Sequence, residues 1–182
     1  MDKSQYKNVY VFVEQRDGVV QNVALELLGK ARELADALHE QVIALLLGKG
    51  VKDKADELIA AGADVVLSIE ADELAQYTTE PYAQAITQVI HERKPSILLS
   101  GATSIGRDLG PRLSARIGTG LTADCTGLDI SEDGDLLMTR PAFGGNLMAT
   151  IICKEHRPQM STVRPGVMRA KAVACTHLTL PK

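Results

Sequence analysis

The stretch Leu98–Cys125, LLSGATSIGRDLGPRLSARIGTGLTADC, decides the fold of this 182-residue chain. It starts as an apolar strand end, breaks at the small residues Ser100–Thr103, and continues into an arginine-containing helix that ends in a second Gly/Thr turn. A parallel strand followed by such a loop leaves backbone N–H groups free at the helix N-terminus, where they can meet an anion. The same pattern is also typical of a plain strand-to-helix connection, in which small residues allow tight packing.

The residues before this stretch alternate between strand and helix patterns. Apolar, β-branched runs predict strands at Val9–Val13, Val42–Leu47, Val65–Ile69 and Ile97–Leu99. Between them, helical spacing of apolar residues predicts Asn22–Leu38, a helix that buries Ala55, Leu58 and Ile59, a short helix over Asp72–Tyr77, and a helix with Thr79 as its N-cap. This βαβαβαβ order with short connections predicts an α/β fold, a three-layer parallel sheet with helices on both faces.

Two residues of the helix after Thr103 are unusual for their positions. Pro111 lacks an N–H group, so we expect the regular helix either to begin near Asp108 or to be kinked. Arg116 lies on the apolar stripe of the helix, where a guanidinium must reach solvent or find an anionic partner. Asp124 is the candidate partner nearby in sequence.

The predicted secondary structure changes after Cys125, from alternating strands and helices to short strands alone. Short strands separated by turns are predicted at Thr126–Ile130, Leu136–Thr139, Leu147–Ile152 and Met160–Val163. Glu132–Asp135 is a hairpin turn signal, and Pro141–Asn146 is a glycine-rich loop. The C-terminal third therefore predicts a small β-meander attached to the α/β sheet.

Composition excludes several classes of function. The net charge of −3 and the lack of a basic run argue against nucleic-acid binding. No apolar stretch reaches membrane-spanning length and the polar N-terminus is unlike a signal peptide, which predicts a cytoplasmic protein without a membrane contact. The three cysteines, Cys125, Cys153 and Cys175, form no CxxC pair, so we expect buried or half-buried thiols and no metal site. A Cys153–His156 hydrolase is disfavoured, because a strand would direct these side chains to opposite faces.

Three long motifs resemble the alpha subunits of electron transfer flavoproteins. They are SGATSIGRDLGPRLSARIGTGLTADCTGLDI (Ser100–Ile130), TRPAFGGNLMATI (Thr139–Ile151) and MSTVRPGVM (Met160–Met168), in the order that the family has them. The opening VYVFVEQRDGVVQNVALELLGKARELA fits the same family. The resemblance extends from Val9 to about Met168.

This resemblance implies the N-terminal domain of an alpha subunit, with an adenine nucleotide hydrolase-like α/β fold, over residues 1–166. Residues 167–182 are then a tail or linker to an FAD-binding domain that this sequence lacks. The family implies an electron carrier, not an enzyme, which forms a heterodimer with a beta subunit and accepts electrons from flavin dehydrogenases. It implies FAD in the full heterodimer, and we expect no tightly bound FAD on this chain alone.

The resemblance also selects candidate residues for the border of a flavin. In electron-bifurcating members this domain borders the flavin of the beta subunit, and we expect the Ser100–Thr103 turn and the Pro141–Asn146 loop there. Gly101, Thr103, Arg140 and Gly144 are the candidate cofactor-binding residues. Arg140 can stabilise the reduced, negatively charged flavin, or it can pair with Asp129 or Glu132. Gly144 can allow close approach of the backbone to a ring, or it can simply form a turn.

A different reading is a stand-alone nucleotide-binding module of the universal-stress type, which shares the βαβ layout. It needs a glycine-rich phosphate loop late in the chain, and Gly144–Asn146 is short for that role. We also expect the isolated domain to self-associate, because surfaces meant for the beta subunit and the second domain would be exposed.

Overall fold

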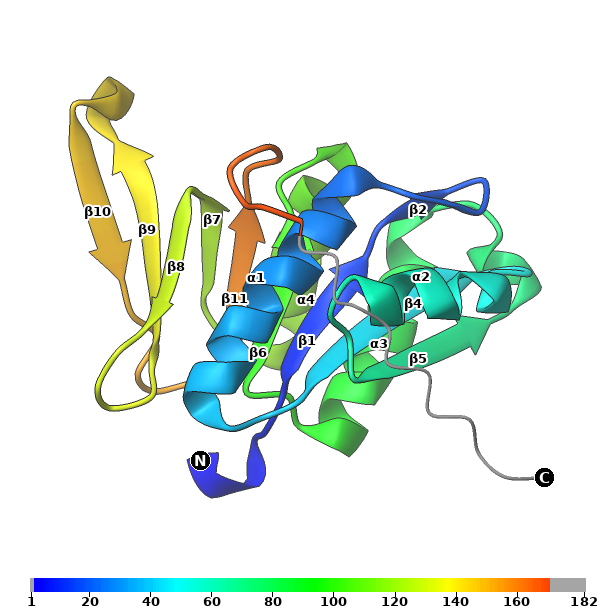
Figure 1. Ribbon diagram of the computed structural model, residues 1–182, viewed down its shortest axis with the longest axis horizontal. Helices are drawn as coiled ribbons and strands as arrows, with labels where there is room; N and C mark the ends of the chain where they lie inside the picture. Colours follow the sequence, from blue (N-terminus) through cyan, green and yellow to red (C-terminus); the bar gives the residue numbers. More distant parts are fainter. Residues whose placement is uncertain (1, 171–182) are drawn as a thin grey trace.

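The spatial order of the strands differs from their order along the chain, and this difference defines the fold. The computed structural model describes residues 2–170. Six strands form one parallel sheet in the order β5-β4-β1-β6-β11-β7 (Figure 1). Their bounds are β1 (Val9–Val13), β4 (Val42–Gly48), β5 (Val65–Glu70), β6 (Ile97–Gly101), β7 (Leu121–Cys125) and β11 (Gln159–Val163). The predicted parallel sheet is confirmed.

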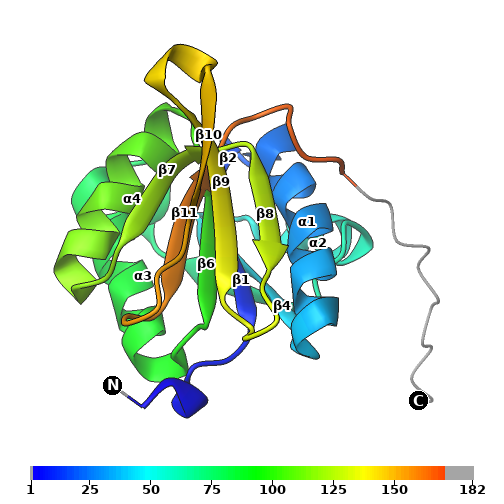
Figure 2. The ribbon, with the colours of Figure 1, turned by 90° about the vertical axis from the view of Figure 1, so that its left-hand side faces the viewer.

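Helices cover both faces of this sheet, as Figure 2 shows. Helices α1 and α2 contribute side chains to the core on one face, and α3 and α4 do so on the other. The helices are α1 (Asn22–Leu38), α2 (Ala55–Ala60), α3 (Thr79–Arg93) and α4 (Ser104–Ile117), with short 3₁₀ turns η1 (Lys3–Gln5), η2 (Lys52–Lys54) and η3 (Asp72–Leu74). The predicted three-layer α/β architecture is therefore confirmed.

The central strand β1 shows why an unbroken apolar run is needed here. Val9, Val11 and Val13 enter the core beneath α1, while Tyr10 and Phe12 enter the core beneath α3. Successive side chains of a strand point to opposite faces, so a strand covered on both sides must be apolar at every position. Full burial of each large side chain contributes about 1.5–3 kcal/mol.

A second, smaller sheet lies beside the parallel one. It is antiparallel, in the order β10-β9-β8, and comprises β8 (Gly127–Ile130), β9 (Leu136–Ala142) and β10 (Leu147–Ile151), with η4 (Phe143–Gly145) at the tip of the last hairpin. The turn between β8 and β9 is closed by the N–H of Ser131, which donates to the carbonyl of Asp135 (2.9 Å). The β-meander predicted in the C-terminal third is confirmed for these three strands.

The fourth strand predicted for the meander lies elsewhere. The stretch Met160–Val163 belongs to β11, which is parallel and lies between β6 and β7 in the main sheet. Residues Leu121–Cys125, for which no strand was predicted, form the parallel edge strand β7. Both assignments depend on pairing between segments that are far apart in sequence, for which the local pattern carries no signal.

The structure corrects two details of α4. Of the two alternatives given for Pro111, a helix that begins near Asp108 is wrong, since α4 runs from Ser104 with Pro111 inside it and with Thr103 as its N-cap. The partner of Arg116 is not Asp124, since the Arg116 guanidinium donates to Glu80 on the neighbouring helix α3. A helix–helix contact that forms only on folding thus supplies the anion that the sequence alone assigned to a nearby residue.

Two local details of shorter segments differ from the sequence prediction. Ile59 is 38% exposed, because α2 has only six residues and Leu58 is the one that is buried in the core. Helix α3 has Thr78, not Thr79, as its N-cap residue. The Thr79 hydroxyl instead donates to the carboxylate of Asp108 on α4 (2.5 Å).

Candidate functional site

The candidate site lies at the carboxyl edge of the parallel sheet, beside the point where the strand order reverses. The chain proceeds from β1 to β4 and β5 on one side, and then crosses to β6 on the other side of β1. In open α/β sheets, ligands bind outside the carboxyl ends of the strands at such a reversal. The residues that follow β1 and β6 are therefore the first to consider.

At the reversal itself, a buried carboxylate fills the space between the two strand ends. Glu14, directly after β1, is only 2% exposed. It accepts a hydrogen bond from the Thr103 hydroxyl (2.5 Å) and forms an ion pair with Arg16 (2.9 Å). Thr103 also accepts the N–H of Gly106 (3.1 Å), so its hydroxyl both caps α4 and holds Glu14. A negative charge at this position disfavours a bound phosphate.

The glycines of this turn are explained by close packing. A Cβ atom on Gly106 would lie 1.8 Å from the carbonyl oxygen of Gly101, so only glycine allows α4 to start this close to β6. A Cβ on Gly101 would lie 2.8 Å from the side chain of Val23 on α1. Gly101 thus meets the packing requirement of a strand-to-helix connection, the second of the two interpretations given for this turn.

A cluster of positive charge lies next to this turn, where β11 and β7 end. Arg164, the first residue after β11, holds the carboxylate of Asp124 through two nitrogens (3.2 and 2.7 Å). Arg107, in the first turn of α4, donates its Nε to the carbonyl of Ala102 (3.0 Å). The hydrogen bond from Arg164 holds the pKa of Asp124 below its ordinary value, and the charges of Arg107 and Arg140 act in the same direction. The charges of three guanidinium groups therefore act on one carboxylate, and Arg164 is the group that donates hydrogen bonds to it.

Arg140 on β9 is the member of this cluster with a free donor. Its Nε is buried and has no hydrogen-bond partner among residues 2–170. The side chain lies on the same face of β9 as the buried Met138, so it is directed to the body of the protein. A buried donor without a partner is costly, and one in a native fold calls for an explanation such as a group that arrives from outside.

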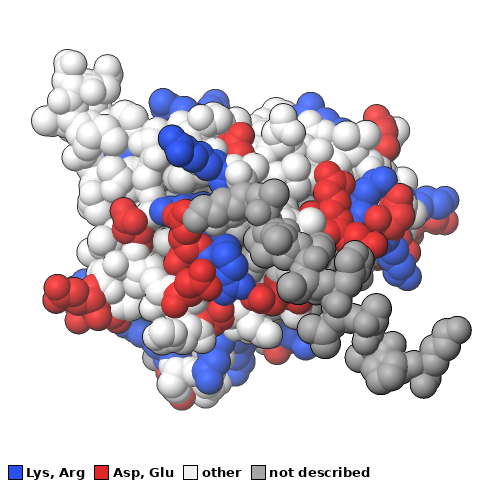
Figure 3. All heavy atoms as spheres, in the orientation of Figure 1, with Lys and Arg blue, Asp and Glu red and all other residues white. Residues whose placement is uncertain are grey.

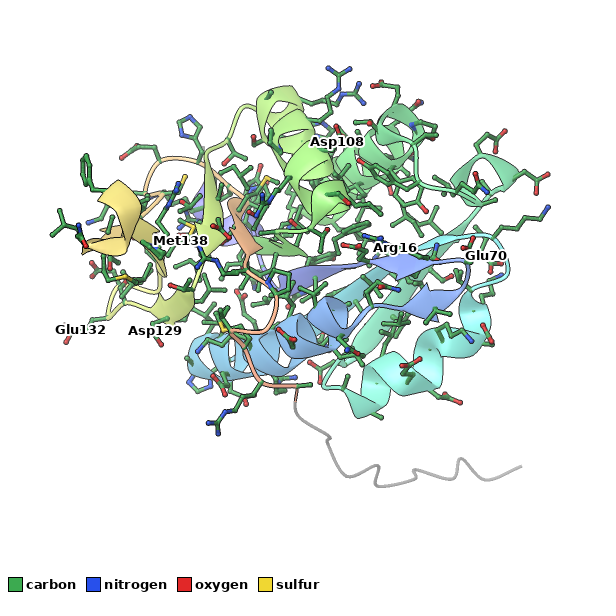
Figure 4. All side chains as sticks on the ribbon, turned by 90° about the horizontal axis from the view of Figure 1, so that it is seen from above. Arg16, Glu70, Asp108, Asp129, Glu132 and Met138 are labelled. Carbon is green, nitrogen blue, oxygen red and sulfur yellow. The ribbon has the colours of Figure 1, made fainter. Side chains whose placement is uncertain are left out.

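The alternative pairing of Arg140 with Asp129 or Glu132 does not occur in the described part of the chain. Asp129 lies opposite Leu137, an odd number of residues from Arg140, so the two side chains project from opposite faces of the small sheet. The nearest cation to Asp129 is Lys30 on α1 (3.9 Å). Figure 4 shows Asp129 and Glu132 at the outer end of the small sheet.

Three of the four candidate residues lie around one corner of the fold. Gly101 is in register with Val163, and Val163 is in register with Cys125. Although burial raises the pKa of the Cys125 thiol, the positive charge of Arg140 acts to lower it. Gly101 and Cys125 are thus two strand spacings apart, about 10 Å. Thr103 lies two residues after the end of β6, at the carboxyl edge of the sheet.

Gly144 lies away from this corner, at the tip of the β9–β10 hairpin. It has a positive φ of 70°, and a Cβ added to it would meet no atom within 4 Å. The neighbouring Phe143 is 83% exposed. The tip projects beyond the rest of the molecule at the upper left of Figure 1.

Sequence reasoning missed most of the cluster. Arg164 appeared only within the motif Met160–Met168 and was not a candidate site residue, and Asp124 was assigned to the wrong arginine. A signal was present, since a residue directly after a parallel strand lies at the carboxyl edge. It became usable only once Met160–Val163 was known to belong to the parallel sheet.

The remaining chemistry of the described residues is limited. Burial raises the pKa of the Cys125 thiol, which therefore stays protonated and is a poor nucleophile. The Cys153 sulfur contacts the backbone carbonyl of His156 (3.7 Å).

Within residues 2–170, no group of three or more His, Cys, Asp and Glu side chains could hold a metal ion. No helix in that range has both the length and the apolar character needed to cross a membrane. Cys175 lies outside the described residues.

Comparison with known proteins identifies similar sequences. A family model described as an electron transfer flavoprotein domain matches residues 9–177. The electron transfer flavoprotein subunit alpha of Clostridium acetobutylicum is 58% identical over 168 residues, which cover 92% of this chain and 50% of that protein. The subunit of the same name from Thermoanaerobacterium thermosaccharolyticum is 57% identical over 166 residues, with 91% and 50% covered. Protein FixB of Clostridium saccharobutylicum is 58% identical over 171 residues, with 92% and 50% covered. The chain thus spans about half the length of these relatives.

Proposed function

Because this chain belongs to the electron transfer flavoprotein family, we propose that it is the N-terminal domain of an alpha subunit. In this role it is part of a carrier that moves electrons from flavin dehydrogenases to acceptor oxidoreductases, and it carries out no catalysis itself. Two relatives that it matches over about half of their length are named as alpha subunits of electron transfer flavoproteins. Residues 1–166 form the domain, and residues 167–182 lead to an FAD-binding domain.

The role of this domain is to dock the beta subunit and to border its flavin. The observation that carries this proposal is the buried Nε of Arg140, which has no partner within residues 2–170. A donor of this kind fits a hydrogen-bond acceptor supplied by another molecule. The flavin, when bound, supplies reversible acceptance of electrons, and its reduced form carries negative charge. Arg140 stabilises that form, with Arg107 and Arg164 adding to the positive field.

The other candidate residues have distinct parts in this arrangement. Thr103 and Gly101 hold the end of β6 and the start of α4 in place, which positions Arg107 against the carbonyl of Ala102. Gly144 gives the exposed hairpin tip a backbone without a side chain, so that it can approach a partner closely. The isolated chain provides only one side of the flavin site, and therefore binds FAD weakly or not at all.

The alternative of a stand-alone nucleotide-binding module is less well supported. A nucleotide would place its phosphates at the strand-order reversal, where the buried carboxylate of Glu14 lies. The only glycine pair late in the described chain is at the exposed hairpin tip, far from a helix N-terminus of the main sheet.

The test is a comparison of two arginine variants in the complex with the beta subunit. Arg140→Gln removes the positive charge, so the reduced flavin loses stabilisation and its reduction potential should fall by tens of millivolts. Arg112→Gln is the matched control, since Arg112 lies later on α4, is 52% exposed, and pairs with the exposed Glu80 of α3. An unchanged potential in Arg140→Gln, or the lack of any complex with the beta subunit, would contradict the proposal.

A further inference from the structure

The edge strand β7 is irregular at the residue that carries its carboxylate, Asp124. The pairing of β7 with β11 puts Thr122 opposite Ser161. Cys125, three residues later on β7, lies opposite Val163, which is only two residues later on β11. The extra residue makes a β-bulge, and Asp124 within it has a positive φ of 60°. Bulges turn a side chain out of the regular alternation of a strand, and they are frequent next to functional sites.

Hydrogen bonds hold the bulge in place. The N–H of Asp124 donates to the hydroxyl of Thr162 (2.9 Å), and the N–H of Arg164 donates to the carbonyl of Cys125 (2.9 Å). The Asp124 side chain is 29% exposed, and each of its two oxygens accepts a hydrogen bond from Arg164. The bulge thus brings the carboxylate of one strand to the guanidinium that follows the next strand.

The same segment lies beside Arg140. Just before β8, the N–H of Thr126 donates to the carbonyl of Thr139 on β9 (2.8 Å). The two segments are antiparallel, so the residues before Thr126 run beside those after Thr139, of which Arg140 is the first. The pKa of Asp124 is lowered first by the hydrogen bond from Arg164, and the charge of Arg140 adds to this effect.

One negative charge opposes the three positive charges of the arginine cluster, which comprises Arg107, Arg140 and Arg164. Within residues 2–170, Arg164 is the member that forms an ion pair, and its partner is Asp124. Glu14, at the strand-order reversal, is already paired with Arg16. The residues from 141 to 153 carry no charge, and Figure 3 shows no acidic or basic atoms over the projecting hairpin end. The hairpin therefore adds nothing to this balance.

We propose that Asp124 is a positioning residue that sets the strength of the positive field at the flavin: it fixes Arg164 and offsets part of the charge of Arg107 and Arg140. Without this carboxylate the cluster stabilises the reduced, negatively charged flavin more strongly. A carrier has to release electrons as well as accept them, and a field of limited strength suits that task. The inference rests on the proposed function, since the field matters only if a flavin lies at this corner.

The experiment measures the reduction potential of the flavin in the complex with the beta subunit. Asp124→Asn removes the negative charge but keeps the shape of the side chain, and asparagine, like aspartate, adopts a positive φ more readily than most residues. The equilibrium should shift about tenfold toward the reduced flavin, which is a rise of about 30 mV for a two-electron couple. This sign is opposite to that expected for Arg140→Gln, whereas general damage to the site would move both potentials in the same direction.

Two further variants separate charge from structure. Glu80→Gln is the matched control, because Glu80 also binds two arginines, Arg112 and Arg116, but does so in the contact between α3 and α4. It should leave the potential unchanged. Asp124→Asn combined with Arg164→Gln removes one negative and one positive charge, so the potential should return close to that of the parent complex.

The outcomes distinguish this inference from the proposed function. A lower potential in Arg140→Gln and a higher one in Asp124→Asn support both. If Arg140→Gln lowers the potential but Asp124→Asn does not raise it, or if Glu80→Gln raises it equally, the role of Asp124 is overturned and the flavin border stands. A double variant whose potential stays as high as that of Asp124→Asn would also overturn it. If neither Arg140→Gln nor Asp124→Asn changes the potential, both proposals fail.

Discussion

Strands β1 and β10 have similar composition but opposite environments. The sequence of β1 is VYVFV and that of β10 is LMATI, and both are free of charge. Every residue of β1 is buried, whereas only Ala149 of β10 is less than about two-fifths exposed. The difference arises because helices cover β1 on both faces, while β10 is the last strand of a sheet that projects from the body. An apolar strand that its own chain does not cover is a surface for another chain.

The largest expected effect tests the buried side of this comparison. Leu46→Ala removes a fully buried side chain of β4 and should lower the free energy of unfolding by about 4 kcal/mol, because a cavity remains in a core covered on both faces. Met148→Ala on β10 should change it by less than about 0.5 kcal/mol. Urea denaturation of both variants measures the contrast. Equal losses would mean that β10 is buried in solution.

A somewhat smaller effect is expected at the joint between the two sheets. Arg157 is buried, and it donates to Asp135 (2.7 Å) and to the carbonyls of Cys153 and His156. Arg157→Ala leaves that carboxylate without a partner and should cost about 3 kcal/mol of unfolding free energy. Lys30→Ala, whose partners Glu33 and Asp129 are both exposed, should cost less than about 1 kcal/mol. Thermal unfolding of both variants checks this, and similar melting temperatures would refute it.

The glycines of the two regions should also differ. Gly106→Ala places a Cβ against the carbonyl of Gly101 and should cost about 2–3 kcal/mol, since backbone must shift. Gly144→Ala has open space around it and should cost only about 1 kcal/mol, from its positive φ. Chemical denaturation distinguishes the two. A larger loss for Gly144→Ala would show that the hairpin tip is packed against something in solution.

The smallest effect concerns the pH dependence of stability. The pKa of Asp124 is lowered in the folded state, mainly by the hydrogen bond from Arg164. Its stabilising effect is therefore present above the unfolded pKa near 3.8 and is lost as the pH falls through the lower folded pKa. Both side chains are partly exposed and screened by water, so Arg164→Ala should lower the stability at pH 7 only slightly. By urea titration, the difference in stability between the variant and the parent chain should shrink as the pH falls below 3.8. A difference that stays constant over this range would assign another role to Arg164.

Much of the fold follows from local patterns. The alternation of apolar strands and amphipathic helices predicted the layers, and the motifs of Ser100–Ile130 and Thr139–Ile151 identified the family, which the family match confirms. The secondary-structure prediction was wrong where a strand pairs with a segment far away in the sequence. Met160–Val163 looks like any short strand, and only its insertion between β6 and β7 shows that it is parallel and buried.

The candidate site was predictable only in part. Arg140 was singled out from a motif, and the structure shows a buried donor without a partner within residues 2–170. Its neighbours Arg107, Asp124 and Arg164 come from three separate elements, and no spacing rule in the chain connects them. Whether Gly101, Thr103, Arg140 and Gly144 bind a flavin remains a prediction for the experiments above.

The amino-acid sequence by itself determined which segments are strands and helices, because burial on one or two faces leaves a periodicity in the order of apolar residues. It also determined the uncharged stretch that makes the β10 edge suitable for pairing. Only the tertiary structure decided that β11 lies between β6 and β7, that Arg116 pairs with Glu80, and that Arg164 pairs with Asp124. These are contacts between residues far apart in the chain, and their energies depend on positions that exist only after the sheet has formed.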